Sequence, residues 1–293
     1  MITGAWRCRA GRPGAYQCPP ERPGAYQCPP ERADAHQCHP ERSEGGHLRL
    51  SLLPSLLLLL AAPSLAAQDG HIADNSFLIE EAYNQEAGVV QHITTFNRAE
   101  AGHVWALGFT QEWPLGGIRN QLSYTIPLVR PGAGGTGFGD VLIHYRHQAL
   151  GNGGSELHVA PRLSLVLPTG SEEKGRGGGA LGLQTNVPVS VVVSPAVATH
   201  YNAGLSLEGE SGSVDAHVAA SAILRVRRWI NFMLETAWSS ADEDVVLLNP
   251  GVRWAFELES GFQIVPGLAY TVALGGGEPD ALFIYLSLEH PFR

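Results

Sequence analysis

The sequence predicts an all-β protein, an antiparallel transmembrane β-barrel of about twelve strands with short periplasmic turns and longer external loops. Three observations lead to this prediction. Segments of alternating apolar and polar residues follow one another from about residue 88 onward, their connections alternate between short and long, and each segment is about 10–13 residues long. Strands of globular sheets average roughly five or six residues, whereas a tilted strand needs roughly 9–11 to cross a bilayer.

Each expected strand has one apolar and one polar face. In the last segment, Leu282, Ile284 and Leu286 fall on one face. Ser287 and Glu289 fall on the other. Clusters of Gly, Asn, Asp or Pro separate the segments, and the expected strands cover residues 88–98, 102–113, 118–130, 139–149, 155–167, 181–193, 196–208, 214–227, 229–239, 244–257, 261–273 and 280–292.

The connections test the prediction independently. After even-numbered strands they are short, namely PLGG, NGGS, SP, the Arg227-Arg228 turn and ESG. After odd-numbered strands they are mostly longer, as in RPGAGGTG and PTGSEEKGRGGG. Outer-membrane barrels have short periplasmic turns and longer external loops, and an even strand number returns both ends of the barrel to the periplasm.

A soluble periplasmic or secreted β-barrel that binds a ligand is the alternative fold, because an inward apolar face gives the same alternation. The expected strands are too many and too long for an eight-stranded soluble barrel. Their polar faces also carry charges of both signs, as a water-filled lumen would.

Residues 1–46 form a low-complexity decapeptide repeat. Its four cysteines recur every ten residues, at Cys8, Cys18, Cys28 and Cys38. Zinc sites favour closely paired cysteines such as C-x2-C, so this spacing does not indicate a metal site. We interpret the repeat as a translation start assigned too far upstream. After Met1 the next methionine is Met233, so the true start would use a codon other than ATG.

Residues 47–67 have the features of a secretory signal peptide. Arg49 precedes an apolar stretch, residues 50–62, and the small residues Ser64 and Ala66 suit a cleavage site. We therefore expect an exported chain. Its residues 68–87 would form a periplasmic lead-in or a plug, between which the sequence does not choose, and residues 88–293 would form the barrel.

The charge balance excludes nucleic acid as a partner. Residues 1–67 hold 7 Arg and 5 acidic residues, so the remaining 226 residues carry 12 basic and 23 acidic residues, a net charge of −11. The chain has a single lysine, Lys174, whereas phosphate binding needs clustered cations. All four cysteines precede residue 68, so the exported chain would have no disulfides.

Aromatic residues lie where membrane interfaces are expected. The tryptophans mostly near strand ends are Trp105, Trp113, Trp229, Trp238 and Trp254. Amphipathic rings at such positions form the girdles of membrane barrels. We expect Phe292, which is in phase with the apolar face but is followed by Arg293, to be the signal that the barrel assembly machinery reads.

The polar faces place charged and histidine side chains inside the barrel, where they would set the polarity and constriction of a pore. Pairing of these residues with one another is the structural alternative, because unpaired charges are costly in a confined lumen. The expected lumen-lining residues are Glu112, Arg146, His158, Arg162, His200, Glu208, Asp215, Arg225, Glu235, Arg253 and Glu289.

The sequence indicates no enzyme, metal site or cofactor. His200, Asn202 and Ser206 share one inferred face, but residues two and six positions apart on a strand lie roughly 7 and 20 Å apart, too far for a catalytic triad. The G-x-S-x-G motif is absent, and the histidines lack the H-E-x-x-H spacing of a zinc site.

Three stretches carry a family resemblance: NSFLIEEAYNQEAGVVQH (75–92), GFGDVLIHYRHQ (137–148) and PRLSLVLPTG (161–170). They resemble the bacterial outer-membrane family labelled putative transporter, MetA-pathway of phenol degradation. The resemblance extends over most of the chain after residue 68. It implies an outer-membrane barrel that passes small, aromatic or otherwise hydrophobic compounds, and it transfers no functional residues.

These observations together predict a passive channel or transporter in the outer membrane of a Gram-negative bacterium. Its expected partners are the lipid bilayer, the barrel assembly machinery and a small-molecule solute. A non-transporting structural barrel and an enzymatic outer-membrane barrel stay open as alternatives, beside the soluble binding protein.

Overall fold

The computed structural model describes residues 75–292 except 153, 209–211, 241–243, 259–260 and 276–277. The decapeptide repeat, the signal peptide and residues 68–74 lie outside the described residues. The strands are β1 (Val89–Ala99), β2 (Trp105–Pro114), β3 (Asn120–Arg130), β4 (Gly137–Phe138), β5 (Val141–His147), β6 (Leu157–Val159), β7 (Arg162–Leu167), β8 (Gly182–Asn186), β9 (Val189–Ser194), β10 (Val197–Leu207), β11 (Val214–Arg227), β12 (Ile230–Ser239), β13 (Val245–Trp254), β14 (Phe256–Glu257), β15 (Gln263–Leu274) and β16 (Ala281–Pro291). Two 3-10 turns, η2 (Gly132–Gly134) and η3 (Glu172–Lys174), lie in the connections.

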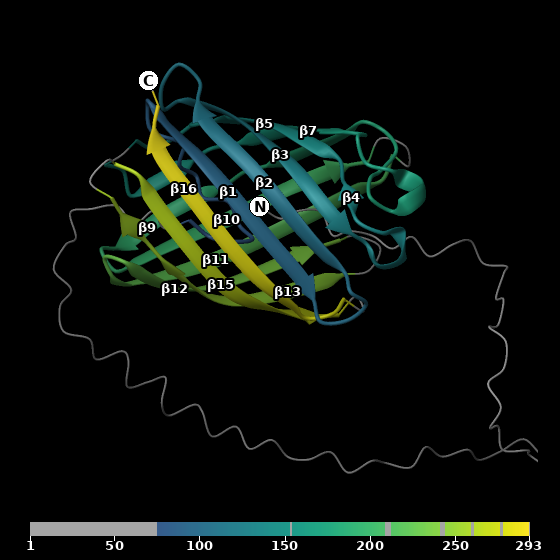
Figure 1. Cartoon of the computed structure of the whole chain (residues 1–293). Helices are drawn as coiled ribbons and strands as arrows, with labels where there is room; N and C mark the ends of the chain where they lie inside the picture. The colour runs from purple at the N-terminus through teal and green to yellow at the C-terminus, as the bar shows by residue number, and fades with distance from the viewer. Residues whose placement is uncertain are drawn as a thin grey trace, which may run out of the picture. The chain divides into compact units, whose positions relative to one another are not determined.

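The strands form one closed antiparallel barrel of twelve spans (Figure 1). Nine spans are single strands, and three are built from two pieces each, β6 with β7, β8 with β9, and β13 with β14. The short β4 pairs with β3. Pairing of β1 with β16, from Val89 opposite Pro291 to Ala99 opposite Ala281, closes the barrel. The prediction of a twelve-stranded, all-β barrel is confirmed.

Prolines interrupt two of the expected strands. The span expected at 155–167 breaks before Pro161, and the span expected at 181–193 breaks before Pro188. The expectation of unbroken strands there was wrong, because proline has no N–H to donate to the ladder. Both proline carbonyls still accept bonds across the barrel wall, Pro161 from the N–H of His147 (3.0 Å) and Pro188 from the N–H of Ala160 (3.1 Å).

The two ends of the barrel differ. Val89 and Pro291, at the two termini of the barrel, lie at one end together with the tight turns 195–196 and 228–229. We call it the periplasmic end, because short turns and both termini face the periplasm in outer-membrane barrels. The opposite, external end carries the long connection 168–181.

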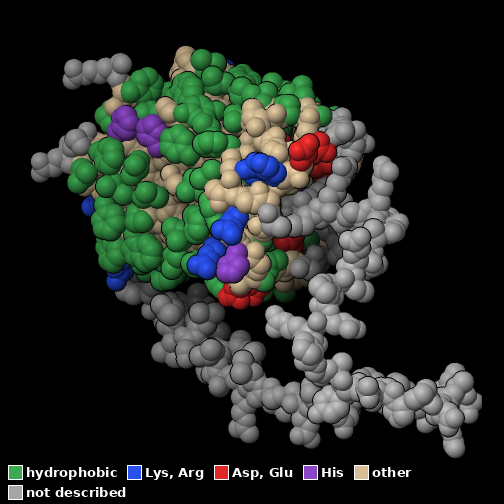
Figure 2. All heavy atoms as spheres, turned by 45° about the vertical axis from the view of Figure 1, so that its right-hand side comes forward, with side chains coloured by type: hydrophobic (Ala, Val, Ile, Leu, Met, Phe, Trp, Pro, Cys, Tyr) green, Lys and Arg blue, Asp and Glu red, His purple; other side chains and the backbone are tan. Residues whose placement is uncertain are grey.

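The outer face of the barrel is apolar along the spans. Leu163 and Leu165 on β7 are 47% and 41% exposed, and Phe232 and Leu234 on β12 are 47% and 49% exposed. Hydrophobic side chains cover most of the face that Figure 2 shows. An apolar surface of this extent is costly in water and matches the hydrocarbon layer of a bilayer, which argues against the soluble alternative.

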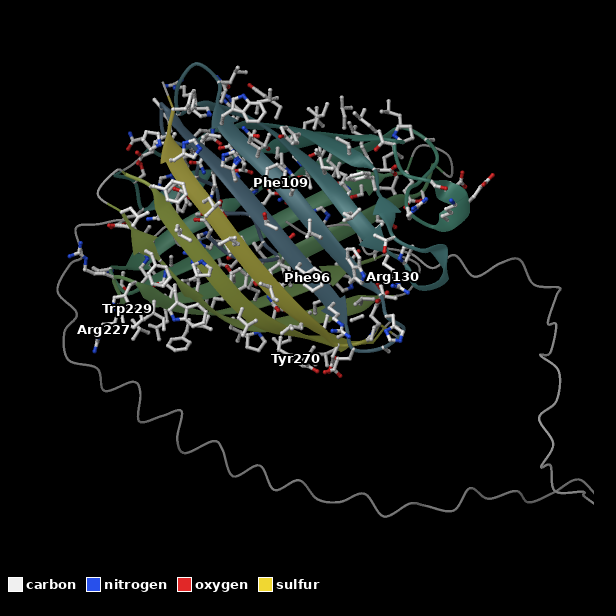
Figure 3. All side chains as sticks on the ribbon, viewed as in Figure 1. Phe96, Phe109, Arg130, Arg227, Trp229 and Tyr270 are labelled. Carbon is white, nitrogen blue, oxygen red and sulfur yellow. The ribbon has the colours of Figure 1, made fainter. Side chains whose placement is uncertain are left out.

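Side chains with polar tips flank this surface. Arg227 and Trp229 lie at the periplasmic end, and Arg130 and Tyr270 lie toward the external end (Figure 3). Within the described residues, no helix is both long and apolar enough to cross a membrane.

The inner face combines polar side chains with an apolar patch, whereas the sequence predicted polar side chains throughout. On β11 to β16 part of the inner face is a hydrophobic cluster that includes Ile223, Met233 and Phe283, beside buried polar residues such as Glu235 and Asn249. On β2 to β10 the inward residues include the buried Thr110, Ser164 and Asn186. The apolar patch arises because residues 77–79 pack against it.

Candidate functional site

The lumen is occupied by the chain itself. Residues 75–86, here called the luminal segment, lie inside the barrel and then lead into β1. Residues 75–82 and Asn84 are buried. The segment has no regular secondary structure, so its backbone N–H and C=O groups need partners from the barrel wall.

Glu235 on β12 holds the first part of the segment. One of its carboxylate oxygens, Oε1, accepts hydrogen bonds from the backbone N–H groups of Phe77 (2.9 Å), Leu78 (2.9 Å) and Ile79 (3.3 Å). The other oxygen accepts a bond from the side-chain amide of Asn249 on β13 (2.6 Å). Glu235 is fully buried, so these donors replace the water that a carboxylate would otherwise bind.

Wall side chains continue to bind the backbone toward β1. Asn202 accepts a bond from the N–H of Glu80 (2.9 Å) and donates one to its carbonyl (2.7 Å). The remaining contacts are Ser190 with the N–H of Ala82 (2.7 Å), Gln148 with that of Asn84 (3.2 Å) and Gln121 with that of Gln85 (2.7 Å). Side chains, rather than strand pairing, therefore hold the segment.

Phe77 anchors the segment to the apolar side of the lumen. Its ring centroid lies 5.5 Å from that of Phe283 and 5.1 Å from that of Tyr285. The same ring fills the space beside two residues without side chains, Gly251 on β13 and Gly267 on β15. A glycine inside a strand often marks a close approach by another group, and here that group is an aromatic ring.

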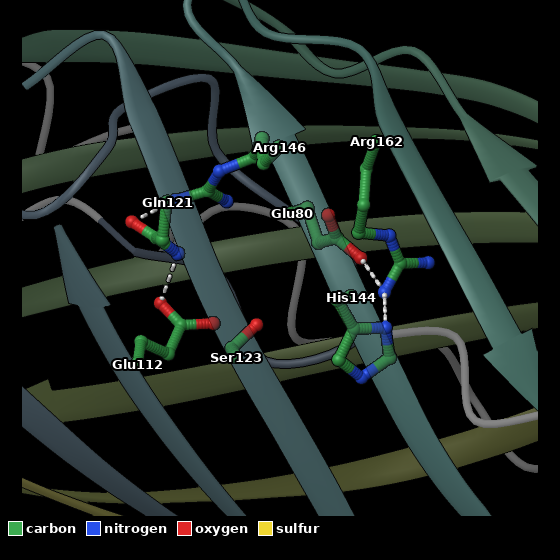
Figure 4. A pocket seen from close by; sticks show the side chains of 7 residues that line it. All are labelled: Glu80, Glu112, Gln121, Ser123, His144, Arg146 and Arg162. Atoms are coloured by element: carbon green, nitrogen blue, oxygen red, sulfur yellow. Dashed lines mark hydrogen bonds and ion pairs between the residues drawn. The ribbon is translucent and has the colours of Figure 1, made fainter. Parts of the chain in front are cut away.

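On the polar side, ionic and hydrogen-bonded groups meet the segment (Figure 4). Arg162 pairs with Glu80 at 2.8 Å and donates to Nδ1 of His144 at 3.2 Å. Because this contact makes Nδ1 the acceptor, the proton of His144 is on Nε2, which bonds to Thr125 Oγ1 at 3.0 Å. Gln121 donates to the carboxylate of Glu112 at 2.8 Å.

Arg146 holds the periplasmic part of the segment. Its guanidinium donates to Asn84 Oδ1 (2.9 Å), to the Glu81 carbonyl (3.2 Å) and to Gln121 Oε1 (3.1 Å), and it also bonds the Tyr83 carbonyl. The planar fork of arginine suits such multiple contacts.

The two adjacent carboxyls of the luminal segment, which is not one of the membrane-spanning strands, differ in acidity. Burial raises the pKa of Glu81 to about 7, with Arg146 opposing the shift and Glu112 adding to it. Burial acts in the same direction on Glu80. There the positive charges of Arg162 and Arg146 outweigh burial and hold the pKa of Glu80 at about 2.

Two small cavities lie beside the segment. A cavity of about 10 Å³ lies among Glu80, Glu112, His144 and Arg162. A second, of about 30 Å³, lies beside Phe77. A single water needs roughly 10–15 Å³, so these two cavities are too small for an organic solute.

The residues expected to line the lumen differ in burial. Six are buried: Glu112, Arg146, His158, His200, Glu235 and Arg253. Five are partly exposed toward the ends or beside the segment: Arg162, Glu208, Asp215, Arg225 and Glu289. Glu208 follows β10 in the external connection, where its carboxylate accepts a bond from the Ser213 hydroxyl (3.2 Å).

Of the residues weighed for catalysis, His200 and Asn202 have other partners. His200 is fully buried, with Nδ1 2.7 Å from the Ser190 hydroxyl, and Asn202 binds the backbone of Glu80. Within the described residues, no group of three or more His, Cys, Asp or Glu side chains is arranged to hold a metal ion.

The expected interface tryptophans lie near strand ends, as their positions in the sequence require. Trp105 begins β2 and Trp113 is its next-to-last residue. Trp238 and Trp254 lie at the ends of β12 and β13, and Trp229 lies in the turn before β12. Phe292 follows β16, and its N–H donates to the Gly88 carbonyl at 2.8 Å. The proposed roles in the membrane and in assembly stay predictions.

Sequence reasoning missed the anchor Phe77 and several wall residues that hold the segment, among them Ser190, Gln148 and Gln121. A signal was available for one part of this site. Gly251 and Gly267 both follow a proline within otherwise apolar strands, and glycine there indicates close approach by another group.

No protein-family model and no curated protein matches the chain. Among solved structures it is similar to the COG4313 outer membrane channel from Pseudomonas putida F1, with a TM-score of 0.53 and 12% identity over 72% of this chain and 98% of that one. The chain has the fold of an outer-membrane β-barrel. It is also similar to the NanC porin (TM-score 0.49, 8% identity, 69% of this chain and 99% of that one) and to the KdgM porin (0.47, 5%, 70% and 99%).

Proposed function

We propose that the protein is an outer-membrane channel or transporter for the passive passage of small, aromatic or otherwise hydrophobic molecules, as in the family it resembles, the putative transporters of the MetA-pathway of phenol degradation. The fold of an outer-membrane channel barrel supports the channel role. The mixed inner wall, apolar around Phe77 and polar around Arg162, supports passage of molecules that combine an apolar body with a polar group.

The arrangement of the luminal segment carries the proposal. The barrel closes through its own ladder of backbone hydrogen bonds, and the segment adds no strand to it. Withdrawal of residues 75–86 would therefore leave the wall intact and vacate the space that they occupy. The closed wall does not need the segment for its own hydrogen bonding, so we infer that the segment controls access to the lumen.

Within this proposal, the lumen-lining residues have two roles. Glu235, Asn202 and Arg146 hold the segment, and their side chains would line the path after it leaves. Arg162 and Glu112 set the polarity of the wall around Glu80. Phe292, in the last residues of the chain, is proposed as the contact for the assembly machinery.

Liposome uptake tests the proposal. The exported chain is refolded into liposomes, and the uptake of small aromatic acids is compared with that of neutral sugars. A variant that combines Phe77→Ala with Glu80→Gln, which removes an anchor on each side of the lumen, should admit solute several-fold faster than the wild type. If neither protein exceeds empty liposomes, the transport function is contradicted.

A further inference from the structure

Two histidines face each other on the outside of the barrel, on the strands that close it. His92 belongs to β1 and His290 to β16, and their Nε2 atoms are 3.3 Å apart. The ring centroids are 5.4 Å apart. The nitrogen atoms are thus about 2 Å closer than the ring centres, so each ring turns its Nε2 vertex toward the other.

In neutral His290 the Nε2 atom, which faces His92, carries a lone pair. Its Nδ1 lies 3.0 Å from the Pro291 carbonyl, which has only lone pairs to offer, so Nδ1 is the protonated nitrogen. Nε2 of His290 is therefore unprotonated in the neutral ring. Histidines that bind metal ions commonly donate the other ring N–H to a backbone carbonyl, which fixes the ring and raises its basicity.

Aromatic neighbours fix the orientation of both rings. Phe109 on β2 is stacked on His92 with centroids 6.1 Å apart, and Phe262, just before β15, is stacked on His290 at the same distance. Both histidines are partly exposed near the periplasmic end of the barrel, where an ion from the aqueous phase can reach them. His290 is one residue before Pro291, the last residue of β16. His92 is three residues after Val89, the first residue of β1.

The separation of the two nitrogens fits one class of metal ion. With Zn–N bonds of about 2.05 Å and a tetrahedral angle, two ligand nitrogens lie about 3.3 Å apart. A square-planar ion with neighbouring ligands at right angles would need about 2.9 Å. Without a metal ion, the two nitrogens are within hydrogen-bond distance of each other.

We propose that His92 and His290 together bind a zinc ion, with water in the remaining coordination positions. The ion would replace the proton between the two rings and join the first and last spans across the seam where the barrel closes. Because the site is made by two residues from opposite ends of the chain, it exists only in the closed barrel. Zinc would bind the folded state and stabilise it.

The test uses protein purified from outer membranes into detergent and freed of metal by a chelator. Addition of ZnCl2 at about 100 times its dissociation constant should raise the Tm by roughly 5–10 °C. His92→Gln and His290→Gln should each abolish most of this shift. His147→Gln is the matched control, because His147 is an exposed histidine bonded to Asn120, and its shift should equal that of the wild type.

A spectroscopic measurement tests the geometry without relying on the folding of a variant. Cobalt(II) added to the wild type should give the strong visible absorption of a tetrahedral site, and zinc should displace it. A Tm that zinc does not change, a shift retained in both His92→Gln and His290→Gln, or only the weak absorption of octahedral cobalt would each overturn the proposal.

Discussion

The ring of Phe77 lies so close to Gly267 that a Cβ atom at position 267 would be 2.3 Å from the Cζ atom of Phe77. Gly251 has the same relationship to the ring from the next span, with 2.8 Å from a Cβ to Cε2. Real Cβ atoms essentially never approach a neighbour to within 3.0 Å. The two glycines thus leave the space that the ring of the luminal segment fills.

Gly267→Ala should displace Phe77 and loosen the luminal segment. Overpacking of a filled core costs about 1–3 kcal/mol, and movement of the segment relieves it. Conductance in planar bilayers should rise relative to the wild type. The double variant Gly267→Ala with Phe77→Ala should gain little over Phe77→Ala alone, because the clash is then absent. Gly154→Ala, where an added Cβ meets no atom within 4 Å, is the control.

Glu80→Gln should destabilise the protein, because Arg162 then loses the carboxylate that balances its buried charge. Both side chains of the pair are about nine-tenths buried, and loss of one partner from a buried pair costs about 3–5 kcal/mol. The free energy of unfolding, measured by urea titration and tryptophan fluorescence in micelles, should fall by that amount. Glu86→Gln, at an exposed position of the same segment, should behave like the wild type, and equal stability of the two variants would contradict the prediction.

Docking of the luminal segment should weaken as pH rises from 5 to 8. Burial raises the pKa of Glu81 from 4.5 to about 7, so the docked segment holds a proton that the released segment loses. This contribution is fully present below about pH 4.5 and is lost as pH rises through 7. Conductance should therefore be higher at pH 8 than at pH 5. Glu81→Gln, which keeps the neutral form, should flatten the pH profile, whereas Glu86→Gln should not.

Asp140 should protect the external connection 168–181 from proteolysis. Its two carboxylate oxygens accept hydrogen bonds from the N–H groups of Gly170 (2.8 Å) and Gly178 (2.7 Å), and thereby fix both ends of the loop. Lys174, the only lysine in the chain, lies between them. Asp140→Ala should therefore speed cleavage by a lysine-specific protease several-fold.

The same protease reports the orientation of the barrel. Lys174 should be cut in intact cells, because its loop is at the external end. Glu278→Ala, in another external connection, is the matched control for Asp140→Ala and should leave the cleavage rate of the wild type unchanged. Cleavage only after the outer membrane is permeabilised would contradict the assigned orientation.

The alternation of residues was enough to predict the barrel and its twelve spans. The segment from Val214 to Arg227 was predicted with the bounds that β11 has. Such strands are predictable because the period of two residues is local, and each span buries one face regardless of its partners. The breaks at Pro161 and Pro188 were also visible in the sequence as prolines within strands, but the prediction passed over them.

The position of the luminal segment was decided only by the tertiary structure. Its contacts join residues more than a hundred positions apart, such as Phe77 with Glu235 and Glu80 with Asn202, and no local period encodes them. The sequence by itself determined that the strands form a membrane barrel, because that requires only alternation and length. Whether residues 75–86 fill the barrel or leave it depends on side chains that converge from many spans, which only the closed wall brings together.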